Sequence, residues 1–384
     1  MKDSGSPVQK PAMGRRQFFK LGAGAGALLS SGAGTTIASA LTAAPAAAEE
    51  FVPGWDLRPV RTQSPVSIDV HTHWTPEAYV KGLAEFGRPH TGDLNPLQVD
   101  LDRRRKWMDE HGVQMLVLTL SGGMPWQWLA PEAAAHLAQI VNDAAIEAHT
   151  AFPNRFLAAV EISARDGALS LKELNRVAGK PGVCAVHLPN SVEGREYIFD
   201  PAFAPFLARC EELGYPLLFH PLDGEVNVYG MPETRLGGPL LNSVRYWNTL
   251  GFPFETATTA ARFIVTGTLD KYPKLEIVLP HSGGCFPYLA GRVGHGLTRR
   301  KFPLQRPFKE YIRRFHYDSM TYDLESLRFL IELVGSDRVV IGTDNSFGPK
   351  QNFEWPNAIV EHLNLPATDQ DRIFKGNAIR LFRL

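Results

Sequence analysis

The stretch VSIDVHTH, residues 66–73, decides how the rest of the sequence is interpreted. Its apolar and polar residues alternate, which is typical of a β-strand whose successive side chains point to opposite faces. The strand ends in His71-Thr72-His73, and side chains two residues apart lie on the same face. The two imidazoles can therefore enter the coordination shell of one metal ion.

Seven further apolar runs follow this strand, separated by helical patterns such as residues 131–150, 201–213 and 324–334. The additional predicted strands are residues 113–120, 155–162, 182–188, 216–220, 275–280, 316–320 and 338–342. Strands that alternate with helices predict an α/β fold with parallel strands and right-handed crossovers. Eight such units favour a (β/α)8 TIM barrel. A doubly wound open sheet is the alternative, but no glycine-rich phosphate loop follows the first strand.

Polar residues that can bind a metal follow several of these strands. His220 ends the fifth strand, His281 follows the sixth, and Asp344 follows the eighth. Each alone could be a hydrogen-bonded core residue, but the strand ends of a barrel meet at one mouth. We therefore expect one Zn²⁺, or another divalent transition metal, per chain. Its expected ligands are His71, His73 and His220, with Asp344 binding or bordering the ion.

The expected chemistry is that of a metal-activated water. The metal lowers the pKa of a bound water toward neutrality, and Asp344 orients that water. His281 is best placed as the general base or acid that moves the proton. His187 closes the fourth strand and faces the mouth, so it is either a substrate contact or a packed core residue.

The N-terminal segment has the features of an export signal. Residues 14–20 read GRRQFFK, which resembles a twin-arginine motif, and a weakly apolar stretch rich in Gly and Ala follows. The stretch ends in three alanines, a small-residue cleavage site. We expect a twin-arginine signal peptide over residues 1–48, an extension over 49–64 and the barrel over 65–384. The predicted location is periplasmic or secreted; a single membrane anchor is the alternative.

Charge and cysteine content exclude other classes of protein. Lysine and arginine total 40, as do aspartate and glutamate; without residues 1–48, 35 basic and 39 acidic side chains remain. No clustered basic surface is expected, and therefore no nucleic acid partner. The three cysteines, Cys184, Cys210 and Cys285, form no C-x-x-C pair, which argues against a disulfide framework and a cysteine zinc site.

Longer phrases carry a family resemblance. KYPKLEIVLPHSGG (residues 271–284), FPYLAGRVGHG (286–296) and DRVVIGTDNSFG (337–348) resemble phrases of the amidohydrolase superfamily. Within it they resemble the α-amino-β-carboxymuconate-ε-semialdehyde decarboxylase branch, as does HPLD at residues 220–223. The resemblance extends from about residue 66 to the C-terminus.

The resemblance implies a reaction, a cofactor and an assembly. It implies Zn²⁺ held by the four expected ligands, with His281 deprotonating the metal water. The implied reaction is non-oxidative C–C cleavage of a small carboxylate, which releases CO₂ without an organic cofactor. Arg292 matches an arginine that such enzymes lend to a neighbouring active site, so a homodimer is implied.

The sequence departs from this branch at three places. Asn345-Ser346 replaces Tyr-Pro after the aspartate, and Leu222 replaces a tryptophan. A second carboxylate-binding arginine is missing near Asn95, where Arg88 or Arg245 is the candidate replacement. We therefore expect a different substrate.

Three functions remain open on the sequence. The first is decarboxylation of a carboxylated aromatic or unsaturated acid, and the second is hydrolysis of a lactone, ester or amide. The third is non-catalytic binding of a metal or ligand in the periplasm. An arginine clamp at the mouth would favour the first.

Overall fold

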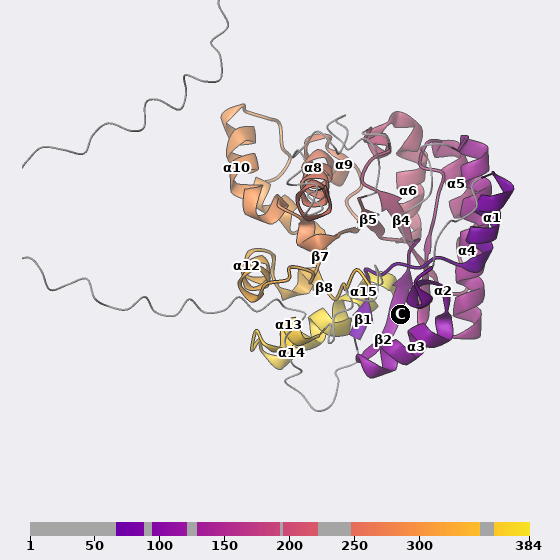
Figure 1. Ribbon diagram of the computed structural model, residues 1–384. Helices are drawn as coiled ribbons and strands as arrows, with labels where there is room; N and C mark the ends of the chain where they lie inside the picture. Colours follow the sequence, from indigo (N-terminus) through magenta and orange to yellow (C-terminus); the bar gives the residue numbers. More distant parts are fainter. Residues whose placement is uncertain (1–66, 88–93, 121–128, 193–194, 222–246, 346–356) are drawn as a thin grey trace, which may run out of the picture. The chain divides into compact units, whose positions relative to one another are not determined.

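The computed structural model describes residues 67–87, 94–120, 129–192, 195–221, 247–345 and 357–384 (Figure 1). The predicted signal peptide and extension lie outside these residues, as do Arg88 and Arg245. Within the described ranges, none of the helices is long and apolar enough to cross a membrane.

Eight parallel strands form one sheet, in which each strand pairs with the next one along the chain. The strands are β1 (Ser67–Asp69), β2 (Val113–Leu118), β3 (Phe156–Val160), β4 (Val183–Pro189), β5 (Leu217–His220), β6 (Ile277–Leu279), β7 (Phe315–Asp318) and β8 (Val339–Val340). Bridges from Asp69 to Ile341 and from Thr72 to Asn345 join the end of β8 to β1 and close the barrel. The predicted (β/α)8 barrel is confirmed, and every predicted strand overlaps an observed one.

Helices connect the strands and surround the barrel (Figure 1). They are α1 (Glu77–Glu85), α2 (Pro96–Val99), α3 (Leu101–Glu110), α4 (Pro131–Ala151), α5 (Gly167–Val177), α6 (Ala204–Leu213), α8 (Phe252–Val265), α9 (Thr268–Lys271), α10 (Phe286–Arg299), α11 (Phe308–Ile312), α12 (Leu324–Val334), α13 (Ala358–Glu361), α14 (Ala367–Asp371) and α15 (Asn377–Phe382). The predicted helix over residues 201–213 divides into a 3₁₀ turn at Pro201–Phe203 and α6.

Helix α12 shows how the local sequence sets these elements. Asp323 caps its first turn by accepting a hydrogen bond from the amide of Ser326 at 2.8 Å. Leu327, Leu330 and Val334 recur at helical spacing and are buried against the barrel. The helix ends before Gly335, where the residue pattern predicts that it should.

Alternate residues of the strands form two separate apolar layers. Leu116 and Phe219 belong to the outer layer, which lies under the surrounding helices. Ile68, Leu157 and Leu218 belong to the inner layer, which fills the barrel. The barrel is therefore a filled core, and a site can form only at one of its ends.

Helix α15 fills the end of the barrel where the strands begin. Its residues Leu381 and Phe382 belong to the inner layer. Asn377 Nδ2 donates hydrogen bonds of 2.7 Å to the carbonyl oxygens of Ser336 and Val339, at the start of β8. This leaves the carboxyl ends of the strands for a functional site.

The inner layer should depend on α15. Replacing Leu381, which is 3% exposed, by alanine should lower the free energy of unfolding by about 2–5 kcal/mol, because it leaves a cavity. Ile379 on the same helix is 39% exposed, so Ile379→Ala should change it by only about 0.5 kcal/mol. Urea unfolding followed by circular dichroism measures both, and equal effects would contradict the packing described.

Candidate metal centre at the barrel mouth

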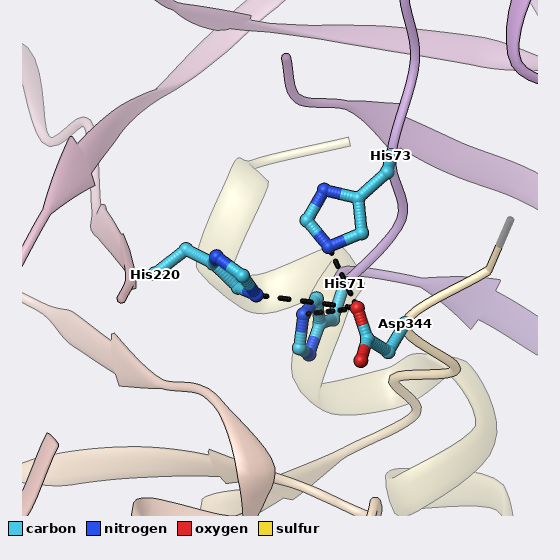
Figure 2. A group of neighbouring side chains, drawn as sticks. All are labelled: His71, His73, His220 and Asp344. Carbon is cyan, nitrogen blue, oxygen red and sulfur yellow. Dashed lines mark hydrogen bonds and ion pairs between the residues drawn. The ribbon is translucent and has the colours of Figure 1, made fainter. Parts of the chain in front are cut away.

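Three histidines and one aspartate meet where the strands end (Figure 2). Each contributes one ligand-type atom that lies within 4.8 Å of the other three; the residues are His71, His73, His220 and Asp344. Asp344 Oδ1 is 2.7 Å from His73 Nε2 and 3.4 Å from His71 Nε2. It is 4.0 Å from His220 Nε2. The structure thus brings together the four residues that the sequence singled out as metal ligands.

The segment after β1 directs both imidazoles of the pair inward. The amide of His71 donates to Asp69 Oδ1 at 3.1 Å, which holds the start of the segment. Thr72 turns the opposite way and donates from Oγ1 to the carbonyl of Val117 at 2.8 Å. The rings of His71 and His73 therefore share one side, with centroids 5.5 Å apart.

Asp344 reaches the cluster because β8 passes very close to β1. A Cβ atom added to Gly342 would lie 2.9 Å from the Cβ of His71, so a larger residue does not fit. The carbonyl of His71 accepts a hydrogen bond from the amide of Asp344 at 2.8 Å. Buried Asp69 accepts another from Thr343 Oγ1 at 2.6 Å. These bonds hold Asp344 at a φ of 52°, a left-handed conformation that is costly for a residue with a side chain.

Asp318, the last residue of β7, is a buried carboxylate that the sequence reasoning missed. It lies 2.6 Å from His71 Nδ1; a carboxylate only accepts, so Nδ1 carries the proton and Nε2 faces the cluster. It also accepts the amides of His281 at 2.9 Å and Ser282 at 2.6 Å. These two residues have φ values of 51° and 56°, so Asp318 also stabilises a left-handed turn. The strand predicted over residues 316–320 placed Asp318 inside the strand, whereas β7 ends at this residue.

Burial and the two carboxylates together set the protonation of the histidines. Burial lowers the pKa of His71, but the charges of Asp344 and Asp318 outweigh it and raise this pKa to about 10. Burial lowers the pKa of His73 to about 4 and holds that of His220 well below its ordinary value. His73 and His220 are therefore neutral at pH 7, whereas His71 must release a proton to act as a ligand.

A cavity of about 360 Å³ opens beside His281 and Asp344. This volume is within the range of small-molecule sites. Hydroxyl and amide groups contribute to its lining, from Asn248, Thr249, Ser282, Thr321, Tyr322 and Ser326. Among the described residues that line it, none is an arginine or lysine.

The two predicted substrate-binding residues lie in different surroundings. His187 is buried in β4, two residues before the strand ends, with its ring centroid 6.4 Å from that of His220. It lines a smaller cavity together with His71 and His220. Arg292 is exposed on α10 and does not contribute to the described lining of either cavity.

Helix α8 supplies an aromatic wall to the site. Phe252, its first residue, has its ring centroid 6.1 Å from that of His220 and 6.3 Å from that of His281. The helix is anchored to the end of β4 by Ser191 Oγ, which donates to Glu255 Oε1 at 2.5 Å. The cluster and His281 therefore rest against a fixed apolar surface.

Comparison with known proteins identifies the family. Residues 68–384 match the sequence model of the amidohydrolase family, so the chain belongs to this family. The family predicted from the sequence phrases is thereby confirmed.

The relatives with known names include decarboxylases. A γ-resorcylate decarboxylase of Rhizobium sp. (strain MTP-10005) is 30% identical over 298 residues, which cover 74% of this chain and 87% of the relative. A 2-amino-3-carboxymuconate-6-semialdehyde decarboxylase of Dictyostelium discoideum is 28% identical over 74% of this chain and 77% of its own length.

A solved structure supports a divalent metal. The dihydroxybenzoic acid decarboxylase from Polaromonas sp. JS666, with bound manganese and the inhibitor 2-nitroresorcinol, is 26% identical to this chain. The match has a TM-score of 0.69 and covers 83% of this chain and 97% of that one. Together with the cluster of three histidines and one aspartate, it supports a divalent metal site here.

The buried carboxyl of Glu255 should make stability depend on pH. Burial raises its pKa from 4.5 to about 7, although the Ser191 hydrogen bond opposes this. The folded protein then binds more protons than the unfolded chain between these values, so stability falls as the pH rises through about 7. Glu255→Gln should remove this loss. The free energy of unfolding of the variant, minus that of the wild type, should therefore be larger at about pH 8 than at about pH 5.

Urea unfolding at both pH values measures this difference. Glu325→Gln is the control, because the Glu325 side chain is 78% exposed. The difference in free energy of unfolding between this variant and the wild type should be the same at the two pH values. A Glu255→Gln difference that does not change with pH would contradict the expectation.

Proposed function

We propose that this chain catalyses the metal-dependent, non-oxidative decarboxylation of a small aromatic acid that carries ring hydroxyl groups. The observation that carries the proposal is the four-residue cluster beside His281, at the edge of a cavity of about 360 Å³. Similarity to γ-resorcylate decarboxylase supports the reaction. The hydroxyl and amide groups of the cavity support a hydroxylated substrate.

In this proposal the cluster holds one divalent cation. Within the described residues, the Nε2 atoms of His71 and His220 are buried without hydrogen-bond partners, as suits nitrogen atoms that face a cation. Three imidazoles and a carboxylate suit Zn²⁺, and Mn²⁺ is the second choice because the related structure contains manganese. When bound, the ion would polarise an oxygen atom of the substrate or of a nearby water.

His281 would move the proton. Its side chain lines the cavity, and its Nε2 lies 3.7 Å from Asp344 Oδ2. It would deliver a proton to the ring carbon that bears the carboxylate. The bond between that carbon and the carboxylate then breaks, its electron pair returns to the ring, and CO₂ leaves. The hydrogen bond from its backbone to Asp318 would keep the imidazole in position.

Hydrolysis of a lactone, ester or amide is the second candidate. It is favoured by the described lining of the cavity, which has no arginine or lysine to bind a substrate carboxylate. In the leading proposal the positive charge that binds the substrate carboxylate comes from Arg292 of a second copy in a homodimer. Arg88 and Arg245 are the other candidates for it.

The metal proposal predicts stoichiometry and pH dependence. Protein loaded with Zn²⁺ or Mn²⁺ should hold about one ion per chain by elemental analysis, and the His71→Ala/His73→Ala double variant should lose it. Binding should displace the proton of His71, whose pKa is about 10. The dissociation constant of the metal should therefore rise about tenfold for each unit by which the pH falls, between about pH 9 and pH 5.

His136→Ala is the control for this experiment, because that histidine is exposed on α4. It should bind the metal as the wild type does. A wild type that holds no ion even after loading would refute the proposal.

The catalytic proposal predicts a separate effect at His281. His281→Ala should lower kcat by about 10²–10⁴-fold and leave the metal content unchanged. Carboxylated phenols, muconate derivatives and lactones are the substrates to screen, with CO₂ and acid release measured side by side. Acid without CO₂ would support the hydrolase. Unchanged turnover in the metal-loaded variant would exclude His281 as the proton carrier, and a metal-loaded wild type that turns over none of these substrates would favour non-catalytic binding.

A further inference from the structure

A second histidine–carboxylate pair lies in the barrel wall beside the cluster. His187 Nδ1 is 2.7 Å from Glu161 Oε1, and the two side chains are 4% and 1% exposed. The same oxygen accepts the amide of Leu120 at 2.9 Å. The backbone amide of Glu161 donates to Asn142 Oδ1 at 2.7 Å, and Asn142 Nδ2 donates to the backbone carbonyl of Glu161 at 2.9 Å. The position of this carboxylate is therefore fixed from several directions.

This anchoring determines which nitrogen of His187 carries a proton. An ionised carboxylate oxygen only accepts hydrogen bonds, so Nδ1 donates to Glu161. Nε2 then presents its lone pair. It is buried and has no hydrogen-bond partner among the described residues. A buried polar atom of this kind calls for a donor.

The room beside His187 fits one small molecule. His187, His71, His220 and Asp318 contribute to the lining of a cavity of about 20 Å³. That volume accommodates a single water but not a substrate ring. The ring centroids of His187 and His220 are 6.4 Å apart, a separation that one water can bridge between two ring nitrogens.

We propose that the Glu161–His187 pair positions His220 through one buried water molecule. His220 Nδ1–H would donate to the water, the water to His187 Nε2, and His187 Nδ1–H to Glu161. His220 Nδ1–H, one O–H of the water and His187 Nδ1–H then each have an acceptor. The inference rests on the proposed metal centre, and it gives His187 a positioning role in place of direct substrate contact.

The geometry of His220 supports this arrangement. Its Nε2 is the nitrogen that faces Asp344, at 4.0 Å from Oδ1, so Nδ1 lies on the other side of the ring (Figure 2). A histidine that binds a metal through one nitrogen donates the other N–H to a carboxylate, a carbonyl or a water, which fixes the ring. His71 has Asp318 for this purpose, at 2.6 Å. The water and His187 would serve His220 in the same way.

Two substitutions of His187 separate its two nitrogens. An asparagine amide lies near the position of Nδ1, so His187→Asn keeps a donor to Glu161 and removes the acceptor at Nε2. A glutamine amide reaches the position of Nε2, so His187→Gln restores that acceptor. His187→Asn should weaken the affinity for Zn²⁺, measured by competition with a chelating dye, by about tenfold or more. His187→Gln should stay within about threefold of the wild type.

A second histidine–glutamate pair, in which the histidine is buried and the glutamate is 34% exposed, provides the control. His316 Nε2 is 2.9 Å from Glu276 Oε2, and the His316 side chain is 0% exposed. It does not contribute to the described lining of either cavity at the mouth. His316→Asn loses an imidazole–carboxylate bond and should lower the thermal unfolding temperature, while the Zn²⁺ affinity stays at the wild-type value.

Each outcome decides between distinct interpretations. Equal losses of Zn²⁺ affinity in His187→Asn and His316→Asn would overturn the proposal, because the effect would then be general. An unchanged affinity in His187→Asn with a raised KM would make His187 a direct substrate contact and also overturn it. A wild type that binds no Zn²⁺ would refute the metal centre itself, which is a different failure. Selective loss in His187→Asn with recovery in His187→Gln supports the water-mediated contact.

Discussion

The buried carboxylate of Asp318 connects the two parts of the site that have to act together. One of its oxygens lies 2.6 Å from His71 Nδ1 and accepts the amide of His281 at 2.9 Å. The other accepts the amide of Ser282 at 2.6 Å. Burial alone would raise the pKa of Asp318, but the hydrogen bond from His71 holds it below its ordinary value. One buried charge thus orients a proposed metal ligand and also fixes the turn that presents the proposed proton carrier.

The barrel and the four clustered residues could be predicted because both follow from local patterns. Apolar runs and helical spacing repeat along the chain, so β8 was found although only Val339 and Val340 pair as a strand. The cluster residues lie at or just after the ends of β1, β5 and β8, where barrel topology brings them together. Convergence was therefore predictable from order alone, without any knowledge of side-chain contacts.

Asp318 could not be predicted in the same way, because its partners are distant in sequence. His71 is 247 residues away, and the amide of His281 is 37 residues away. The apolar pattern of its strand is also interrupted by His316, so the sequence does not mark where the strand ends. Two glycines after His281 indicate a turn, but the left-handed φ of His281 depends on the carboxylate that accepts its amide. The sequence around Arg88 and Arg245 carries no such pattern, and both residues lie outside the described ranges.

The charge of the mouth limits what can bind there. Asp344 lines the cavity and stays ionised, because its pKa is held well below the ordinary value although burial opposes this. A substrate carboxylate would approach this like charge in a lining whose described residues offer no arginine or lysine. Without the metal, protonated His71 offsets the charge of Asp344; a divalent cation that displaces this proton would therefore change the net charge of the four residues from about zero to positive. Binding of the metal and of an acidic substrate should therefore be coupled, whereas a neutral lactone would not need the cation for its affinity.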